Sequence, residues 1–196
     1  MLLAAVAILT PLLVGFAPPR QPAPAISLQL DAGYGGRFRP DGWTPLLLTV
    51  ANDGPDVSGA LRVRAENNPG LNATTYSTPI DLPRQSRKQV FLYVSMEAPT
   101  RQITVELAST TGEILASASQ PVLPATPRDV LAVVVTEAPG GSLDLTAIAL
   151  GGGASYQANW TTNHIPPLAS ALLGLDVMVF ADVDTGRLAV EQQQAI

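Results

Sequence analysis

The sequence predicts a multidomain protein of the β plus α/β class, with an antiparallel β-sandwich over residues 26–123 and an incomplete parallel α/β unit over residues 129–196. Three observations predict it. In the first part apolar and polar residues alternate, which is the period of a strand with one buried face. The second part opens with the apolar run VLAVVV at residues 130–135, as in a strand that is buried on both faces. Between them, residues 121–127 (PVLPATP) contain three prolines and show neither period, so we place a linker at residues 124–128.

Composition excludes several classes of function. With 46% hydrophobic and 14% charged residues the chain is not of the disordered class. Residues 26–123 carry eight basic and nine acidic groups, and residues 124–196 carry two basic and seven acidic ones, so no basic face for nucleic acid is expected. The absence of cysteine removes thiolate nucleophiles, disulfides and cysteine-based metal sites. With His164 as the only histidine, a metal site would need oxygen ligands.

The N-terminal residues 1–25 are predicted to be a signal peptide or an N-terminal membrane anchor. Residues 2–16 are apolar except for Thr10 and Pro11, which is shorter than the ~20 residues of a membrane-spanning helix. Ala23, Pro24 and Ala25 then give the small-x-small pattern of a cleavage site. Either form places the rest of the chain outside the cytoplasmic membrane. The alternative is a buried helix of the fold.

The first part contains about seven short strands. Five of them show alternating apolar positions: Ile26, Leu28 and Leu30; Leu46, Leu48 and Val50; Leu61 and Val63; Val90, Leu92 and Val94; Ile103, Val105 and Leu107. Further strands are expected near residues 75–80 and 114–118. Turn signals separate them at residues 39–42, 52–55, 68–70 and 111–112. This number and spacing of strands is typical of an immunoglobulin-like sandwich.

Two segments of the sandwich support this assignment by resemblance. Residues 43–54 (WTPLLLTVANDG) and 57–63 (VSGALRV) resemble the bacterial extracytoplasmic Ig-like domains, in which a strand ending in Asn-x-Gly precedes a Gly-containing partner strand. The resemblance covers about half of the chain and implies a fold, not an activity. Antigen-type recognition is not implied, because a cysteine pair is lacking and Trp43 precedes the second strand.

Two features of the sandwich could bind ligands. Residues 33–38 (GYGGRF) are rich in glycine, but they lack the Gly-Lys-Ser/Thr ending of a phosphate loop, so we interpret them as a flexible connection between strands. Trp43, Tyr76, Phe91 and Tyr93 could form a platform for a sugar. The alternative is that these rings belong to the covered face of the sandwich and its rim.

The second part alternates strands and helices. We expect strands at residues 130–135, 156–161 and 177–181, a helix at residues 143–150 capped by Ser142 with Asp144 in its first turn, a short helix or turn at residues 166–173, and a helix from residue 190. In this last helix Gln192 stands at the third position, while Ala189 occupies the capping position. This order predicts a parallel sheet of the Rossmann-like or flavodoxin-like type with right-handed crossovers.

This second part resembles class I glutamine-amidotransferase-like domains attached to bacterial membrane proteins. The matching residues are 129–135 (DVLAVVV), 173–182 (LGLDVMVFAD) and 188–192 (LAVEQ). The resemblance covers the N-terminal part of such a domain, and the last helix stops at Ile196 without a cap, so we expect a C-terminally truncated chain. Active members of the family use a cysteine nucleophile, which is missing here, so the resemblance implies a fold without amidotransferase activity.

One carboxylate pair is a weak candidate for a metal site. Asp182 and Asp184 follow a predicted parallel strand, where open α/β sheets bind ligands, and two carboxylates can hold Mg²⁺. In haloacid-dehalogenase-type phosphatases a Thr stands two residues after such a pair, whereas here Gly186 does. A solvated loop that caps the next helix is the alternative reading. His164 is interpreted as a polar loop residue.

The sequence thus predicts a non-catalytic structural or interaction protein of the bacterial cell envelope, exported and membrane-associated. No catalytic residue and no cofactor are predicted. The expected partners are the membrane, through the leader or a missing C-terminal segment, and an envelope protein. Two alternatives stay open. One is an enzyme with a carboxylate-based site in the completed α/β domain, and the other is a carbohydrate- or peptide-binding module on the sandwich.

Overall fold

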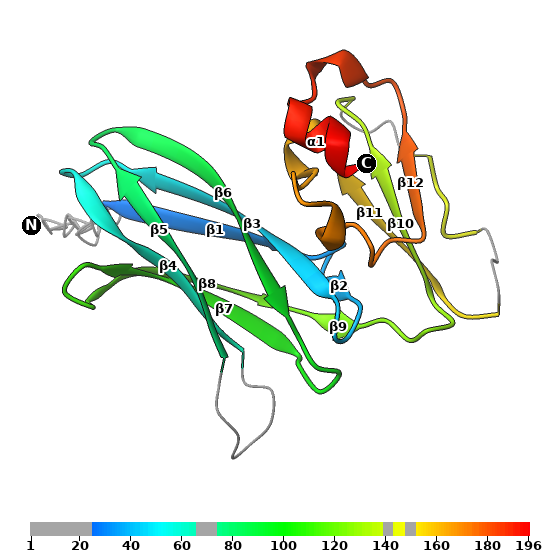
Figure 1. The fold of residues 1–196 in the computed structure, drawn as a ribbon, viewed down its shortest axis with the longest axis horizontal. Helices are drawn as coiled ribbons and strands as arrows, with labels where there is room; N and C mark the ends of the chain where they lie inside the picture. Colours follow the sequence, from blue (N-terminus) through cyan, green and yellow to red (C-terminus); the bar gives the residue numbers. More distant parts are fainter. Residues whose placement is uncertain (1–24, 66–73, 139–142, 148–151) are drawn as a thin grey trace, which may run out of the picture.

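The computed structural model describes residues 25–65, 74–138, 143–147 and 152–196. Two units lie side by side along the long axis of the molecule, a β-sandwich at the N-terminal side and a smaller unit around a second sheet (Figure 1). The predicted leader, apart from Ala25, and the turn expected at residues 68–70 lie outside the described residues. Within those described, no helix has the length and apolar character needed to cross a membrane.

The sandwich consists of two antiparallel sheets. The first has the order β1-β3-β6 and comprises β1 (Ile26–Ala32), β3 (Trp43–Asn52) and β6 (Ser86–Ser95). The second has the order β5-β4-β7-β8 and comprises β4 (Val57–Ala65), β5 (Thr74–Leu82), β7 (Gln102–Ser109) and β8 (Ile114–Pro121). The seven strands predicted from the sequence, five of them from the alternating pattern, are confirmed, and they form a β-sandwich of the immunoglobulin-like kind.

The core of the sandwich lies between the alternating apolar faces. On the first sheet Leu46 and Leu48 are fully buried, and they lie opposite Leu92 and Val90 in the register of β3 with β6. Leu61, Val105 and Leu107 face them from the second sheet and are also fully buried. Each such side chain contributes roughly 1.5–3 kcal/mol when it leaves water, so these residues supply the main stabilisation of the unit.

Two short strands connect the sandwich to the linker. β2 (Arg37–Phe38) pairs in parallel with β9 (Leu123–Pro124), so Pro124 at the start of the predicted linker is part of a strand. Phe38 is fully buried in the sandwich core. The chain therefore leaves the sandwich beside the connection that joins its first two long strands.

The second unit is built on a three-stranded parallel sheet of order β11-β10-β12. Its strands are β10 (Val130–Val135), β11 (Ser155–Trp160) and β12 (Val177–Phe180). They lie within one residue of the predicted strands, and pairing is parallel on both sides of β10. Val133, Val134 and Val135 are completely buried, as expected for a central strand with both faces covered.

The helix predicted at residues 143–150 is wrong for its described part, because residues 143–147 are not helical. Asp144 Oδ1 accepts hydrogen bonds from the backbone N–H of Thr146 at 2.9 Å and from its hydroxyl at 2.6 Å, which closes a local turn that competes with a helix. The side chain of Gln157 on β11 binds the backbone of Leu143 and Leu145. Ser142 and residues 148–150 lie outside the described residues.

The remaining turns of helix are short. η1 (Thr162–His164), η2 (Ala169–Ala171) and η3 (Thr185–Arg187) are single 3₁₀ turns, and α1 (Val190–Ala195) is the one α-helix within the described residues. As predicted from its third position, Gln192 accepts from the N–H of Ala189 at 2.9 Å. Its amide also donates to the carbonyls of Thr162 and Ile165 at 2.9 and 2.8 Å, which ties α1 to the segment after β11.

Candidate functional site

The glycine-rich residues 33–38 form a structured contact between the two units. Tyr34 leaves the sandwich and is 2% exposed in the core of the second unit, where it packs with Trp160 at a ring distance of 6.0 Å. Its hydroxyl donates to the carbonyl of Ala171 in η2 at 2.7 Å. Burial raises the pKa of this phenol above its ordinary value. The interpretation of this segment as a flexible connection is therefore wrong, because its tyrosine completes a second core.

Glycine is required on both sides of this contact. Gly33 has a φ of +58°, and a Cβ there would lie 2.3 Å from the carbonyl oxygen of Arg37. A Cβ on Gly174 would lie 2.6 Å from the hydroxyl oxygen of Tyr34 and 2.8 Å from its ring. The glycine pattern of the sequence thus reports a tight loop and a close approach, and no phosphate site.

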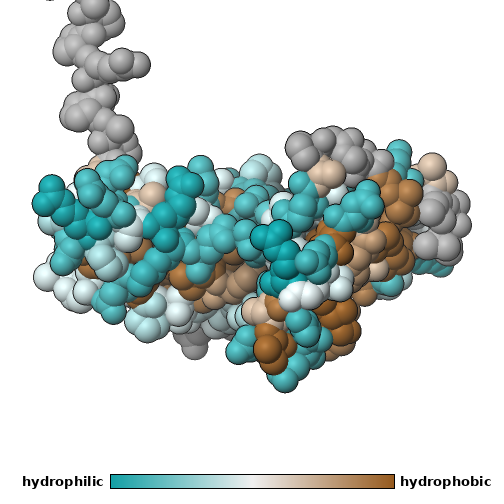
Figure 2. Space-filling view, turned by 90° about the horizontal axis from the view of Figure 1, so that it is seen from above, coloured by the Kyte–Doolittle hydropathy of each residue, from teal (hydrophilic) through white to brown (hydrophobic). Residues whose placement is uncertain are grey.

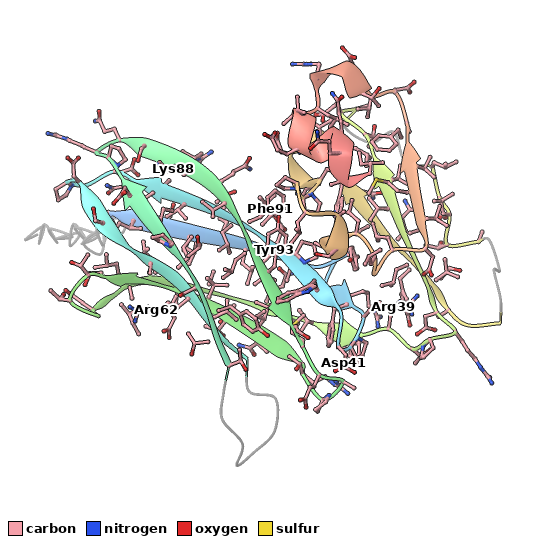
Figure 3. The ribbon with its side chains drawn as sticks, in the orientation of Figure 1. Arg39, Asp41, Arg62, Lys88, Phe91 and Tyr93 are labelled. Carbon is pink, nitrogen blue, oxygen red and sulfur yellow. The ribbon has the colours of Figure 1, made fainter. Side chains whose placement is uncertain are left out.

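Arg39 forms the polar half of the contact. One of its terminal nitrogens donates to Asp176 Oδ2 at 2.6 Å and to the carbonyl of Asp129 at 2.7 Å, and the other donates to the carbonyl of Thr126. Asp176 also accepts from the N–H of Leu131 at 2.8 Å. A single guanidinium, labelled in Figure 3, therefore joins the sandwich to the linker and to the starts of β10 and β12. We call the Tyr34 and Arg39 contacts together the seam.

A small pocket of about 100 Å³ opens beside the seam, with walls from both units. The sandwich wall is a row across the outer face of its first sheet, because Asp31 lies opposite Leu47 and Leu47 lies opposite Phe91. The opposite wall contains Asn159 and Trp160 of β11, with His164 of η1, and Gln120 completes the lining. The pocket is smaller than the roughly 300–1,000 Å³ of a usual ligand site, but it lies at a junction of two units, where such sites are often found.

His164 is one of the residues that line this pocket. Its Nδ1 accepts from the backbone N–H of Thr161 at 3.2 Å and lies 2.9 Å from the Thr161 hydroxyl, so the neutral ring carries its proton on Nε2. That Nε2 is 3.9 Å from Asp31 Oδ2, which is too long for a direct hydrogen bond. The ring stacks on Trp160 at 6.4 Å. The sequence placed His164 in a polar loop and gave no signal of this neighbourhood.

The four aromatic residues proposed as a sugar platform fall into two pairs. Trp43 and Tyr76 meet edge to face with ring centroids 6.1 Å apart, and Phe91 and Tyr93 stack in parallel at 6.2 Å on the face of β6. Figure 3 shows Phe91 and Tyr93 on the side of the sandwich nearer the second unit. The hydroxyl of Tyr93 is buried without a hydrogen-bond partner in the described part of the chain, and burial raises its pKa to about 12.

Asp182 and Asp184 do lie just after β12, as predicted. Asp182 has a φ of +54°, and Asp184 Oδ1 accepts from the N–H of Gly186 at 3.0 Å and so caps η3. This is the capping role weighed as the alternative. Over residues 25–65, 74–138, 143–147 and 152–196, no group of three or more His, Cys, Asp or Glu side chains could hold a metal ion.

Other carboxylates of the second unit also bind backbone. Asp129 accepts from the N–H groups of Thr126 and Ala154 at 2.7 and 3.0 Å, and these bonds lower its pKa. Glu137 accepts from the N–H and the hydroxyl of Thr162 at 2.8 and 2.7 Å, which lowers its pKa as well. These carboxylates fasten the ends of β10 to neighbouring segments.

The fold and seam define a β-sandwich protein with a small parallel sheet docked on one end. The chain belongs to the family described as a domain of unknown function, DUF8726, which matches residues 25–122. No curated protein matches the chain significantly.

Two solved structures illustrate what the fold is similar to. The sporulation control protein Spo0M from Bacillus subtilis is 8% identical, with a TM-score of 0.37, and the match covers 52% of this chain and 50% of Spo0M. This chain thus spans about half the length of Spo0M. The CARDB domain of the PF1109 protein from Pyrococcus furiosus is 12% identical, with a TM-score of 0.39, and the match covers 57% of this chain and 100% of that domain.

Proposed function

We propose that this chain is a non-catalytic structural or interaction protein of the bacterial cell envelope, located at the outer face of the cytoplasmic membrane. The observation that carries the non-catalytic part of the proposal is the use of the carboxylates in the second unit, while the location rests on the apolar leader at residues 2–16. Five of them accept hydrogen bonds from backbone N–H groups and hold the fold together: Asp129, Glu137, Asp144, Asp176 and Asp184. Carboxylates that accept such hydrogen bonds stabilise the fold, and they are poor candidates for proton transfer or metal binding.

The surface of the second unit supports a role in interaction. Figure 2 shows hydrophobic residues gathered on this unit, while the visible side of the sandwich is largely hydrophilic. Its strongly exposed large apolar residues in the described ranges are Leu143, Leu168, Leu173, Val190 and Ile196. Leu173 is the extreme case at 84% exposure. Exposed apolar surface of this kind suits a protein partner.

We further infer that the second unit follows the glutamine-amidotransferase-like α/β plan and serves as a scaffold. The strand order β11-β10-β12 supports this inference, since it is the 2-1-3 order that opens a flavodoxin-like sheet. The parallel pairing and the completely buried central strand support it too.

Export is tested with a reporter enzyme that is active only outside the cytoplasmic membrane, fused after Ile196. We expect activity from the full chain and none from a control that lacks residues 1–25. No activity from either protein would contradict the proposal, and so would equal activity from both.

The interaction role is tested in the same cells with a photo-crosslinking amino acid at Leu173. The matched control carries it at Ile114, which is 55% exposed on the sandwich. We expect a discrete adduct with an envelope protein from position 173 and none from position 114. The same adducts from both positions, or none from either, would contradict a specific interaction through the second unit.

A further inference from the structure

The pocket beside the seam offers an unusual combination of polar groups. Asp31 brings a carboxylate whose side chain is 68% exposed, and it is the charged acceptor among the lining residues. The donors are more numerous. His164 carries its proton on Nε2, because Nδ1 accepts from Thr161, and this Nε2 lies 3.9 Å from Asp31 Oδ2. A hydroxyl oxygen placed beside this pair, not between its two atoms, can lie within hydrogen-bond distance of both.

Two amide side chains add further donors. Gln120 uses its oxygen to accept from the N–H of Ala32 at 2.9 Å, and Asn159 uses its oxygen to accept from Gln157 at 2.8 Å. With the oxygens engaged, each side chain has its NH₂ group left as a donor. The fixed oxygens therefore determine what these two residues present to a ligand.

Asn159 contributes backbone groups on the edge of β11 that does not pair with β10. Val130 donates to the carbonyl of Ala154, and Thr136 donates to the carbonyl of Trp160, so the even-numbered residues of β11 bind β10. In a parallel pair, alternate residues of an edge strand point their N–H and C=O away from the partner. Asn159 therefore turns its backbone N–H and C=O toward the pocket side of the strand.

An apolar wall completes the site. Phe91 lies beside Leu47 in the sandwich wall and stacks in parallel with Tyr93, with an interplanar angle of 8° (Figure 3). Trp160 and the ring of His164 form the opposite aromatic wall. Flat aromatic surfaces of this kind pack against the C–H faces of a ring.

This chemistry selects a class of ligand. The carboxylate of Asp31 disfavours an anion. A bare cation is disfavoured as well, because the site offers it one carboxylate and several hydrogen-bond donors. A hydroxyl can accept from His164 Nε2–H and donate to Asp31 at the same time, while neighbouring hydroxyls accept from the amides of Gln120 and Asn159. We propose that the pocket receives one edge of a terminal sugar residue, with a hydroxyl contacting both His164 and Asp31 and the C–H face of the sugar ring against Phe91. This inference stands apart from the proposed envelope role.

The experiment titrates glucose and N-acetylglucosamine, and methylammonium as a cation, against a Trp43→Phe protein, in which Trp160 is the remaining tryptophan. We expect saturable fluorescence changes with at least one sugar in the millimolar range, typical of weak binding. Asp31→Asn should weaken that binding by roughly tenfold, because a hydrogen bond to a charged group is lost. The control Asp81→Asn, an exposed residue on β5, makes the same charge change on the other sheet and should bind as the parent does.

Three results would overturn the proposal: no saturable response to either sugar, equal weakening by Asp31→Asn and Asp81→Asn, or a response to methylammonium alone. Each of these can be obtained even where export fails, since the purified protein is used. Failure here and failure of the envelope role are thus distinguishable.

Discussion

The hydroxyl of Tyr34 donates a 2.7 Å hydrogen bond to the carbonyl of Ala171, so a residue of a sandwich loop is part of the core of another unit. The two residues are 137 positions apart in the chain. The contact combines a buried aromatic ring with a satisfied polar group, which is the favourable way to bury a tyrosine. The sandwich thereby supplies packing that three short parallel strands lack.

Arg39 should contribute to stability because its planar guanidinium group donates hydrogen bonds to several acceptors at once. Arg39→Ala removes bonds to three groups at once, and we expect a loss of about 1–3 kcal/mol in the free energy of unfolding. Arg39→Lys should recover only part of it, because an ammonium cannot reproduce the planar fork. Urea unfolding measures both. The control Arg62→Ala, at an exposed position on β4, should change stability little, and an equal loss there would contradict the assignment.

Gly174→Ala should disturb the seam from the opposite side. The new Cβ would lie 2.6 Å from the Tyr34 hydroxyl oxygen, so the ring must move and overpacking of roughly 1–3 kcal/mol is expected. In a double-mutant cycle with Tyr34→Ala, most of that cost should vanish because the clash partner is gone. Gly42→Ala serves as the control, since its Cβ would meet ordinary contacts at 3.5 Å. Additive effects of the two seam substitutions would contradict the contact.

Tyr93→Phe should be neutral or slightly stabilising. The Tyr93 hydroxyl is buried and has no hydrogen-bond partner among the residues that the structure describes, so its removal relieves an unsatisfied polar group. Thermal unfolding should show a change from about zero to 1 kcal/mol in favour of the variant. A clear destabilisation would mean that this hydroxyl has a partner in solution.

Stability should fall in acid partly through Asp129. Bonds from the N–H groups of Thr126 and Ala154 lower its pKa in the folded protein, so its contribution is present above the ordinary carboxyl range and is lost as the pH falls through the lowered folded value. Asp129→Asn should therefore be less stable than the parent near neutral pH, and the difference should shrink on acidification. Urea midpoints measured from pH 7 downward test this. A difference that grows in acid would contradict the sign.

The strands could be predicted from the sequence because burial imposes a period on them. Leu46, Leu48 and Val50 alternate along β3 because they face the sandwich core, and residues 130–135 are apolar throughout because both faces of β10 are covered. The helix expected at residues 143–150 was wrong where the structure describes it, because Asp144 closes a local turn and Gln157 binds the adjoining backbone. No periodicity reports such side-chain competition.

The seam and the pocket could not be predicted for a different reason. Tyr34, Arg39, Asp31 and His164 meet through contacts between distant segments, and no short-range pattern encodes them. The glycines at positions 33, 35 and 36 are a visible signal in the sequence, but by themselves they predict a flexible connection. The positive φ values and the close approach of Gly35 to Ala158 show that it permits docking.

The most direct test of the account follows unfolding of the Trp43→Phe protein by Trp160 fluorescence and by far-ultraviolet circular dichroism together. Trp160 reports on the second unit, and the circular dichroism is dominated by the sandwich strands. If Tyr34 joins the cores, the two urea midpoints should coincide. Tyr34→Ala should then lower the midpoint measured by Trp160 fluorescence below the midpoint measured by circular dichroism. Separate midpoints in the Trp43→Phe protein, or midpoints that stay together after Tyr34→Ala, would contradict the account.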